Sequence, residues 1–389
     1  MRIAITHPYS WPEVRRGAER IIVETARALA ARGHDVTVLS AGDTAGWTDR
    51  TVADGYTTVR FRRVFDHAGL HERWFGARVA VWLARHRVDV THAFMPYDAL
   101  AAIATKRRHG HTTLYDEMGI PGHTWADRRD GRARERVARR VDVYGCMSQH
   151  ALDALAHHTG RRAVRIPGGA RLTEFTPAEA REPRPTLLFS GAFELRWKGV
   201  HVLLDALALV AADEPDVQLW LSGPGDATRL LAEAPPAARE RTHVLPLGDP
   251  GDQADRYRRA WATVLPSTNE SFGMVLLESL ASGTPIVTSD HAAPQELVTP
   301  EVGAVAVHED PASLADALRH AIALARDPAT AGRCRAAAEP YGWDEGIAPL
   351  LERLYRDGEA AAVTTGPSGT TGTSGTPGTS GTPGATGAP

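Results

Sequence analysis

Two glutamates that stand eight positions apart, Glu270 and Glu278, have the spacing and surroundings that most suggest chemistry. The β-branched run at residues 262–266 predicts a strand, and the apolar positions of residues 276–281 predict one face of a helix, which Gly283-Thr284-Pro285 ends. Glu270 therefore lies in the loop between strand and helix, and Glu278 lies about two turns into the helix. Because Glu is common in helices, Glu278 alone could equally be a solvated surface residue.

The loop between this strand and helix offers backbone donors. Residues 266–273 read Pro-Ser-Thr-Asn-Glu-Ser-Phe-Gly, so Phe272 and Gly273 stand at the helix start, where N–H groups have no partner within the helix. Such a helix start favours an anionic or hydroxyl-rich ligand. In an open parallel sheet, ligands bind at the carboxyl ends of the strands, where this loop lies. The strand, the loop and the second glutamate together predict a ligand site.

This stretch and its continuation at residues 278–287, Glu-Ser-Leu-Ala-Ser-Gly-Thr-Pro-Ile-Val, resemble the Glu-x7-Glu motif of the retaining glycosyltransferases of family 4. The resemblance covers nearly all of the chain before residue 358. It implies an α/β fold in which two Rossmann-like, doubly wound domains face each other across a cleft (the GT-B fold). It also implies a hexosyltransferase that moves a hexose from a nucleoside diphosphate sugar to a hydroxyl acceptor, with retention at the anomeric carbon.

The chain has 389 residues, which exceeds what a single core usually covers. We expect an acceptor-side domain at 1–175, a linker at 176–185, a nucleotide-sugar domain at 186–342 and a crossover helix at 343–358. The remaining residues, 359–389, are dominated by Gly, Thr, Ser and Pro. Such a composition cannot bury a core and predicts a disordered tail.

Short β-branched runs alternate with helical patterns along both predicted domains, as parallel sheets require. The predicted strands are residues 3–6, 36–40, 59–64, 88–94, 112–116, 141–147, 186–190, 217–221, 243–247, 262–266, 286–289 and 303–308. The predicted helices include residues 18–32, an exposed Arg-rich helix at 125–140, and residues 151–157, 200–212, 252–261 and 311–326.

The loop before the first helix reads Arg16-Gly17-Ala18-Glu19. It resembles the family's Gly-Gly-x-Glu loop, with one of the two glycines kept. The resemblance places Gly17 at the donor and Glu19 on the acceptor side. An ordinary glycine loop would have the same appearance.

A second loop, residues 191–199, carries basic residues between a strand and a helix start, a position that suits a diphosphate. It resembles the family's Gly-Arg-x-x-x-x-Lys-Gly loop. Gly191 and Lys198 match, whereas Ala192 stands where the family has Arg, and we expect Arg196 to substitute. Exposed surface cations are the alternative interpretation.

The resemblance assigns roles to these residues. Glu278 would accept the ribose hydroxyls, and Glu270 would hold hydroxyls of the transferred sugar beside backbone N–H groups of Ser271, Phe272 and Gly273. Glu270, Lys198 and Arg196 are the expected catalytic residues, with the two cations stabilising the departing diphosphate. The expected donor site consists of Gly17, Gly191, Lys198, Glu270, Ser271, Phe272, Gly273, Met274 and Glu278. No metal, no cofactor and no protein nucleophile is expected, because the family is thought to use front-face attack.

Two adjacent carboxylates, Asp116 and Glu117, follow a predicted strand at the position where the family often carries a histidine near the acceptor. They are expected on the acceptor side, to bind hydroxyls or an amine, although a strand-terminal cap is an equal alternative. His92 and His123 are weaker candidates nearby.

The charge is unevenly distributed. Residues 1–175 carry 28 Lys and Arg against 19 Asp and Glu, while the rest of the chain carries 16 against 28. A basic first half suits an anionic acceptor or peripheral contact with the anionic inner face of a membrane, although solvated arginines would give the same count. The partners expected are a UDP- or GDP-hexose and a glycan, lipid or small-molecule acceptor. Nucleic acid is not expected, because no aromatic pattern accompanies the charges.

Location is indicated by what the sequence does not contain. It has two cysteines far apart, no apolar run long enough for a bilayer and a polar N-terminus, which together predict a cytoplasmic protein.

Three other activities fit parts of the pattern. A nucleotide-sugar epimerase would use Asp116 and Glu117 as acid and base over the sugar, and a phosphorylase would need a cofactor lysine and a longer chain. The third is an inactive sugar-nucleotide-binding protein of the same fold.

Overall fold

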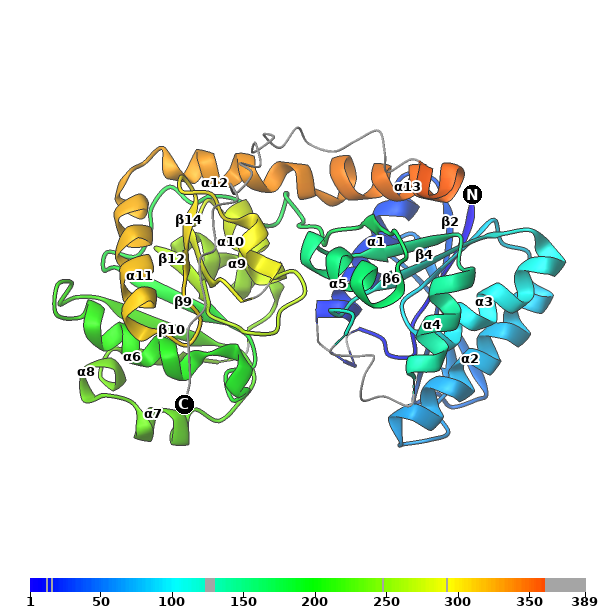
Figure 1. Cartoon of the computed structure of the whole chain (residues 1–389), viewed down its shortest axis with the longest axis horizontal. Helices are drawn as coiled ribbons and strands as arrows, with labels where there is room; N and C mark the ends of the chain where they lie inside the picture. Colours follow the sequence, from blue (N-terminus) through cyan, green and yellow to red (C-terminus); the bar gives the residue numbers. More distant parts are fainter. Residues whose placement is uncertain (12, 15–16, 123–129, 247, 292, 361–389) are drawn as a thin grey trace, which may run out of the picture.

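The computed structural model describes residues 1–360 apart from 12, 15–16, 123–129, 247 and 292. Figure 1 shows two α/β units side by side, with the first half of the chain in one and most of the second half in the other. The expected fold class, two Rossmann-like parallel-sheet domains, is confirmed. Most of the predicted tail, residues 361–389, lies outside the described residues, and so does His123.

The first unit is built on an eight-stranded sheet in the order β3-β4-β2-β1-β5-β6-β7-β8. Its strands are β1 (Arg2–Thr6), β2 (Asp35–Gly42), β3 (Thr48–Ala53), β4 (Tyr56–Arg62), β5 (Val90–Ala93), β6 (Thr112–Glu117), β7 (Val143–Cys146) and β8 (Val164–Arg165). Its helices are α1 (Gly17–Ala31), α2 (Ala68–Arg85), α3 (Pro96–His109), α4 (Gly131–Arg140) and α5 (Gln149–Thr159). Every neighbouring pair of strands is parallel except β3 with β4.

The antiparallel strand β3 was not predicted from the sequence. It forms a hairpin with β4 through Asp54 and Gly55, which have φ of 54° and 80°. Positive φ at both central residues is the geometry that Asp-Gly favours in two-residue hairpin turns. β3 is exposed throughout, so it has no apolar alternation that would have marked it as a strand.

The second unit has a six-stranded, fully parallel sheet in the order β11-β10-β9-β12-β13-β14. Its strands are β9 (Thr186–Ser190), β10 (Gln218–Ser222), β11 (Thr242–Leu245), β12 (Ala262–Leu265), β13 (Ile286–Ser289) and β14 (Gly303–Ala306). Its helices are α6 (Val200–Val210), α7 (Thr228–Glu233), α8 (Pro236–Arg239), α9 (Pro250–Arg259), α10 (Met274–Ala281) and α11 (Pro311–Arg326), with 3₁₀ turns η1 (Arg196–Lys198) and η2 (Ala293–Leu297).

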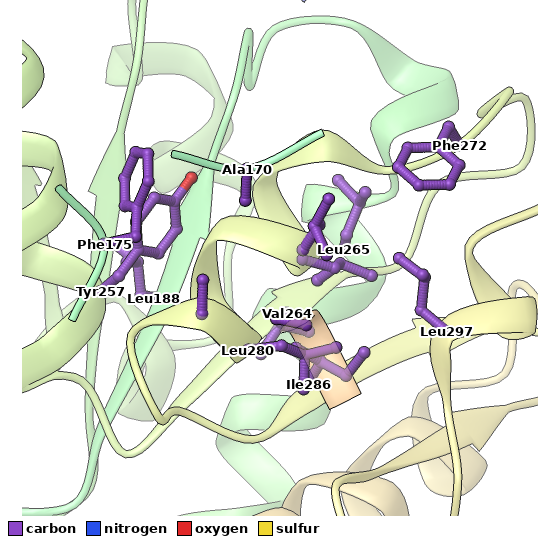
Figure 2. Packing of buried hydrophobic residues seen from close by; sticks show 14 of the residues in the cluster. Ala170, Phe175, Leu188, Tyr257, Val264, Leu265, Phe272, Leu280, Ile286 and Leu297 are labelled. Atoms are coloured by element: carbon purple, nitrogen blue, oxygen red, sulfur yellow. The ribbon is translucent and has the colours of Figure 1, made fainter. Parts of the chain in front are cut away.

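The central strands of the second sheet are buried on both faces, as expected where helices cover a parallel sheet on both sides. Figure 2 shows the packing: Leu188 of β9, Val264 of β12 and Ile286 of β13 lie in one apolar cluster with Leu280 of α10. The cluster holds α10 firmly against the sheet, which fixes the direction in which the start of this helix points.

The chain returns to the first unit after α11. Helix α12 (Thr330–Ala338), the 3₁₀ turn η3 (Glu339–Tyr341), the π-helical turn η4 (Trp343–Ile347) and α13 (Ala348–Asp357) run along one side of both units, orange to red in Figure 1. On α13, Glu352 pairs with Arg32 at 2.8 Å, and the Tyr355 hydroxyl lies 2.8 Å from His92 Nδ1. These contacts tie the end of the second unit to the first.

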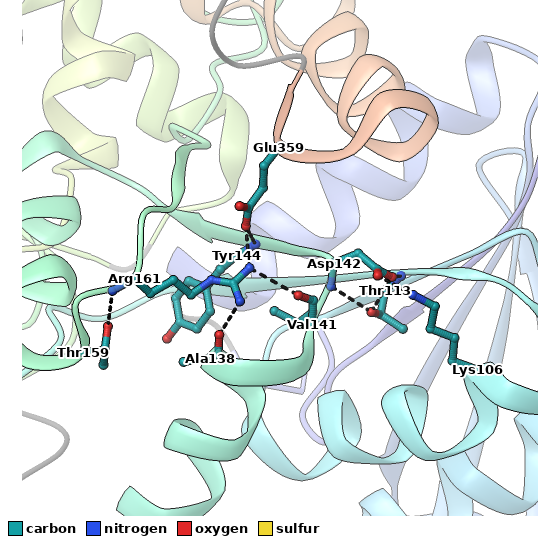
Figure 3. A network of polar contacts seen from close by, with 9 residues as sticks. All are labelled: Lys106, Thr113, Ala138, Val141, Asp142, Tyr144, Thr159, Arg161 and Glu359. Atoms are coloured by element: carbon teal, nitrogen blue, oxygen red, sulfur yellow. Dashed lines mark hydrogen bonds and ion pairs between the residues drawn. The ribbon is translucent and has the colours of Figure 1, made fainter.

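Glu359, which was predicted to belong to the tail, is also held by the first unit. Figure 3 shows its carboxylate accepting from the Tyr144 backbone N–H at 3.1 Å and pairing with Arg161. Arg161 in turn donates to the carbonyl oxygens of Ala138 and Val141. The chain is therefore still packed on the first unit at Glu359, one residue beyond the predicted end of the crossover helix.

Candidate active site

The loops after β9 and β12 lie at the same edge of the second sheet, because these strands are parallel neighbours. They are joined by an ion pair: the Lys198 ammonium donates to the Glu270 carboxylate at 2.6 Å. The two side chains are 14% and 20% exposed, so the pair remains open to a ligand. Lys198 Nζ also lies 4.3 Å from the centre of the Trp197 ring, a cation–π contact that holds it in place.

Two glycines make this arrangement possible. Gly199, at the start of α6, has φ of 72°, and a Cβ there would lie 2.2 Å from the Pro266 carbonyl oxygen. Gly273, the cap of α10, has φ of 90°, and a Cβ there would lie 2.9 Å from Pro294. The close approach brings Lys198 to Glu270 and leaves the N-terminus of α10 at the same edge.

Gly191 directly follows β9 and has a φ of 149°, a backbone conformation that side chains rarely allow. Its N–H donates to the Ser222 carbonyl at 2.9 Å, and its own carbonyl oxygen would lie 2.1 Å from a Cβ on Gly223. Arg196 is exposed on η1. Burial of His201 lowers the pKa of that imidazole, and the positive charge of Arg196 lowers it further. The loop therefore presents one exposed cation, Arg196, and one that is held against a carboxylate, Lys198.

Glu278, the second glutamate of the pair, is almost completely buried, with 4% of its side chain exposed. Its carboxylate forms an ion pair at 2.7 Å with Arg20, and Arg20 lies on helix α1 of the other unit. Burial raises the pKa of the Glu278 carboxyl, and the Arg20 charge opposes this shift. The carboxylate expected to bind ribose is thus held by a cation from the facing domain, a contact that the sequence did not predict.

Arg20 is itself supported by an aromatic ring and borders a cavity. Its guanidinium lies 5.3 Å from the centre of the Phe175 ring, which packs edge-on against Tyr257 at 5.9 Å. A cavity of about 420 Å³ opens beside it, lined by Trp11, Arg20, Val23, Glu24, Arg27, Arg171, Thr173 and Glu174. The cavity thus borders Arg20, the partner of Glu278, whereas Glu278 itself is not among the lining residues.

The residues between the two glutamates face the first unit. Ser271 Oγ lies 4.0 Å from Met147 Sδ, and the backbone at Gly168 lies so close to Phe272 and Met274 that a Cβ on Gly168 would overlap them. Phe272 is 2% exposed. Phe272 thus serves in packing between the units, and only its backbone can contribute to a ligand.

In the first unit, Gly17 begins α1 and is exposed, whereas Glu19 is 1% exposed. Residues 15–16, immediately before Gly17, lie outside the described residues. Glu19 is thus buried in this structure, and its acceptor role stays a prediction.

The second predicted acceptor residue, Glu117, is also buried. It is 3% exposed and its carboxylate pairs with Arg134 of α4, while Tyr115 donates a hydrogen bond to it at 3.0 Å. The helix predicted to be exposed at residues 125–140 thus has a buried face that carries this arginine, and residues 125–129 lie outside the described part. In this structure Glu117 is held by Arg134 and Tyr115, and its acceptor role stays a prediction.

Asp116 is buried as well, at 3% exposed, and its Oδ2 lies 3.9 Å from His92 Nε2. Burial raises the pKa of the Asp116 carboxyl. Both carboxylates that a nucleotide-sugar epimerase would use as acid and base are therefore buried in this structure.

Another carboxylate joins the two units. Glu296 of η2 accepts from the backbone N–H groups of Gln149 and His150 at 3.0 and 2.8 Å, and lies 3.2 Å from Arg165. It therefore caps the N-terminus of α5 from the opposite unit.

The described residues contain neither a metal-ligand cluster nor a membrane-spanning helix. Over residues 1–360 with the gaps given above, no group of three or more His, Cys, Asp or Glu side chains lies close enough to hold a metal ion. In the same part of the chain no helix is both long and apolar enough to cross a bilayer.

Comparisons with known proteins match both units. Residues 15–174 match the family model described as Glycosyltransferase Family 4, and residues 184–323 match that of Glycosyl transferases group 1. A phosphatidyl-myo-inositol mannosyltransferase of Mycobacterium tuberculosis is 31% identical over 383 residues, covering 91% of this chain and 96% of the relative. A D-inositol 3-phosphate glycosyltransferase of Xylanimonas cellulosilytica is 34% identical over 306 residues, covering 73% and 70%.

Solved structures agree on the fold. A sucrose-phosphate synthase from Thermosynechococcus elongatus superposes with a TM-score of 0.78 at 21% identity, covering 92% of this chain and 99% of that one. Anabaena HepE in complex with UDP and glucose gives 0.71 at 17% identity, covering 91% and 99%. The match of sequence over both units, together with the Glu270–Lys198 and Glu278 geometry, leads to one conclusion: this chain belongs to the family 4 glycosyltransferases and has their two-domain GT-B fold.

Proposed function

We propose that this glycosyltransferase moves a hexosyl unit from a nucleoside diphosphate sugar to a hydroxyl acceptor, with retention and without a metal. The observation that carries the proposal is the Lys198–Glu270 pair, which stands partly open at the sheet edge to which the N-terminus of α10 also points. A cation, a carboxylate and free backbone N–H groups at one edge match the needs of a sugar diphosphate: charge for the phosphates and acceptors for the hydroxyls.

In the proposed reaction the acceptor oxygen bonds to the anomeric carbon on the face from which the diphosphate leaves. The bond between that carbon and the phosphate oxygen breaks, and the departing phosphate oxygen takes the acceptor proton. Lys198 and Arg196 stabilise the charge that grows on the diphosphate, and Glu270 holds hydroxyls of the transferred sugar. Glu278 accepts from the ribose hydroxyls after Arg20 has moved from it to the diphosphate.

The acceptor we propose is a hydroxyl compound that carries phosphate, with an inositol phosphate as the first candidate. Both relatives described above are named for inositol-bearing acceptors. The excess of basic residues in the first unit suits such an acceptor. A lipid-linked acceptor would require peripheral contact with a membrane.

The test combines binding and product analysis. The thermal shift caused by UDP, GDP and their sugars identifies the donor, since a ligand at 100 times its Kd adds about 2.7 kcal/mol of stability. The identified donor is then offered with phosphatidylinositol, inositol 3-phosphate or inositol, and the anomeric configuration of the product is read by NMR. The expected product has the configuration of the donor, in the presence of a chelator as well. An inverted product, or activity that disappears with the chelator, would contradict the proposal.

A further inference from the structure

A second cavity, of about 470 Å³, lies in the first unit away from Lys198 and Glu270. It is bounded by the amino ends of β1 and β2, the hairpin β3–β4, the second half of α2 and the loop that follows it. Its lining includes Arg2, Asp35, Thr37, Thr48, Arg50, Thr57, Phe61, Arg78, Trp82, Arg85, His86 and Arg87. None of the residues assigned to the transfer reaction borders this cavity.

The lining is strongly cationic. Five arginines border the cavity against one carboxylate, Asp35. Arg2 forms an ion pair with Asp89 at 2.8 Å. Within the part of the chain that the structure describes, the other four make no ion pair; they are Arg50, Arg78, Arg85 and Arg87. Like charges that gather without a carboxylate partner repel one another, so an anion between them would be strongly favoured.

Arg78 shows that the cavity wall is built and is not a chance gathering of surface cations. Its guanidinium lies 5.2 Å from the centre of the Phe61 ring, which fixes its plane. Its Nε is buried and has no hydrogen-bond partner among the described residues. A buried guanidinium N–H without an acceptor costs free energy that a bound oxyanion would recover.

The remaining wall adds hydroxyls and a flat apolar surface. Thr37 and Thr57 are paired across β2 and β4, so their hydroxyls lie on one face of the sheet and border the cavity together. Opposite them on α2, the Trp82 ring stacks on His86 with 4.2 Å between ring centres and 9° between planes. Hydroxyl donors and arginines together are the groups that bind phosphate oxygens.

We propose that this cavity is a second binding site, separate from the transfer site, for a ligand that carries two or more phosphate groups. Four unpaired guanidinium groups exceed what one carboxylate can neutralise, whereas a diphosphate or two phosphate monoesters match them. The same chemistry occurs in a soluble phosphorylated compound and in a phosphorylated lipid headgroup, and the experiment separates these two sources.

The experiment uses full-length protein that carries Lys198→Ala, which weakens binding of a phosphate probe at the transfer site. Pyrophosphate binding is measured by calorimetry for this protein and for two further variants made in the same background, R85A/R87A and the control R107A/R108A. Both pairs remove two exposed arginines, but the control pair lies at the end of α3 and does not border the cavity. Arg78→Met is a second test variant, since it keeps the apolar contact with Phe61.

We expect pyrophosphate binding that weakens about tenfold or more in R85A/R87A and in Arg78→Met, but not in the control. In the vesicle arm, the same proteins are sedimented with phosphatidylcholine vesicles that contain phosphatidic acid. Binding to vesicles but not to pyrophosphate, with the same dependence on Arg85 and Arg87, would identify a headgroup as the ligand. Binding to neither probe, or an equal loss in the control pair, would overturn the proposal.

Discussion

Arg20 and Glu278 stand 258 positions apart in the sequence and meet at 2.7 Å, one from each unit. Glu278 is the more deeply buried partner: burial raises the pKa of its carboxyl, and the charge of Arg20 opposes this shift. A nucleotide that uses Glu278 for its ribose must take over this carboxylate from Arg20. The pair therefore connects the contact between the units to the occupancy of the donor site.

Replacing Arg20 by Met is expected to make stability more dependent on pH. Burial raises the pKa of Glu278 above 4.5, so the folded state holds this proton more tightly than the unfolded state. Stability therefore falls as pH rises from 4.5 to the folded-state pKa and is constant above it. Without Arg20 the folded-state pKa rises further and the falling range widens. Urea unfolding between pH 5 and 8 should show a larger loss in Arg20→Met than in wild type, whereas R107M on α3 should match wild type.

Removing the Lys198 charge is expected to weaken transfer. Lys198→Ala should lower kcat by about 100-fold or more, because a cation aimed at the leaving group acts most strongly in the transition state. Initial rates with the identified donor measure the effect, and circular dichroism checks the fold. The control is Arg229→Ala, which removes an exposed cation of α7 that pairs with Glu233. Equal rates in Lys198→Ala and wild type would remove Lys198 from the mechanism.

The buried pair Arg134–Glu117 is expected to serve stability and not acceptor binding. Arg134→Met leaves the Glu117 carboxylate buried without its partner, which should cost about 3–5 kcal/mol. Arg139→Ala on the same helix removes a cation that is 78% exposed and should cost less than about 0.5 kcal/mol. Urea unfolding gives both values. A Glu117→Gln variant with wild-type stability but a raised KM for the acceptor would contradict this expectation and support acceptor binding by Glu117.

Gly199→Ala is expected to disturb both fold and site. The residue has φ of 72°, and its new Cβ would meet the Pro266 carbonyl at 2.2 Å, a backbone atom that cannot move away alone. We expect a loss of about 2 kcal/mol or more and weaker donor binding, since Lys198 is its neighbour. The matched control is Gly332→Ala in the interior of α12, where a Cβ meets nothing within 4 Å. That change should stabilise the chain by about 0.5–1 kcal/mol.

The sequence by itself determined the two α/β units and the loops that carry Lys198, Glu270 and Glu278. Strand runs, helix stripes and glycine stops are local patterns, and local patterns set local structure. The hairpin β3–β4 had a local signal too, Asp54-Gly55, but no buried stripe to support it.

Only the tertiary structure decided which charges are free. Arg20 and Arg134 lie in helices, as many other arginines of this chain do, and nothing in their local sequence sets them apart. In the folded protein, however, each forms an ion pair with a buried carboxylate. Residue type gives the charge of a side chain, whereas its burial and its partner depend on elements that are distant in sequence. For this reason Glu270 stays partly open, Glu117 is buried, and four arginines without an ion-pair partner among the described residues border a cavity that the sequence did not predict.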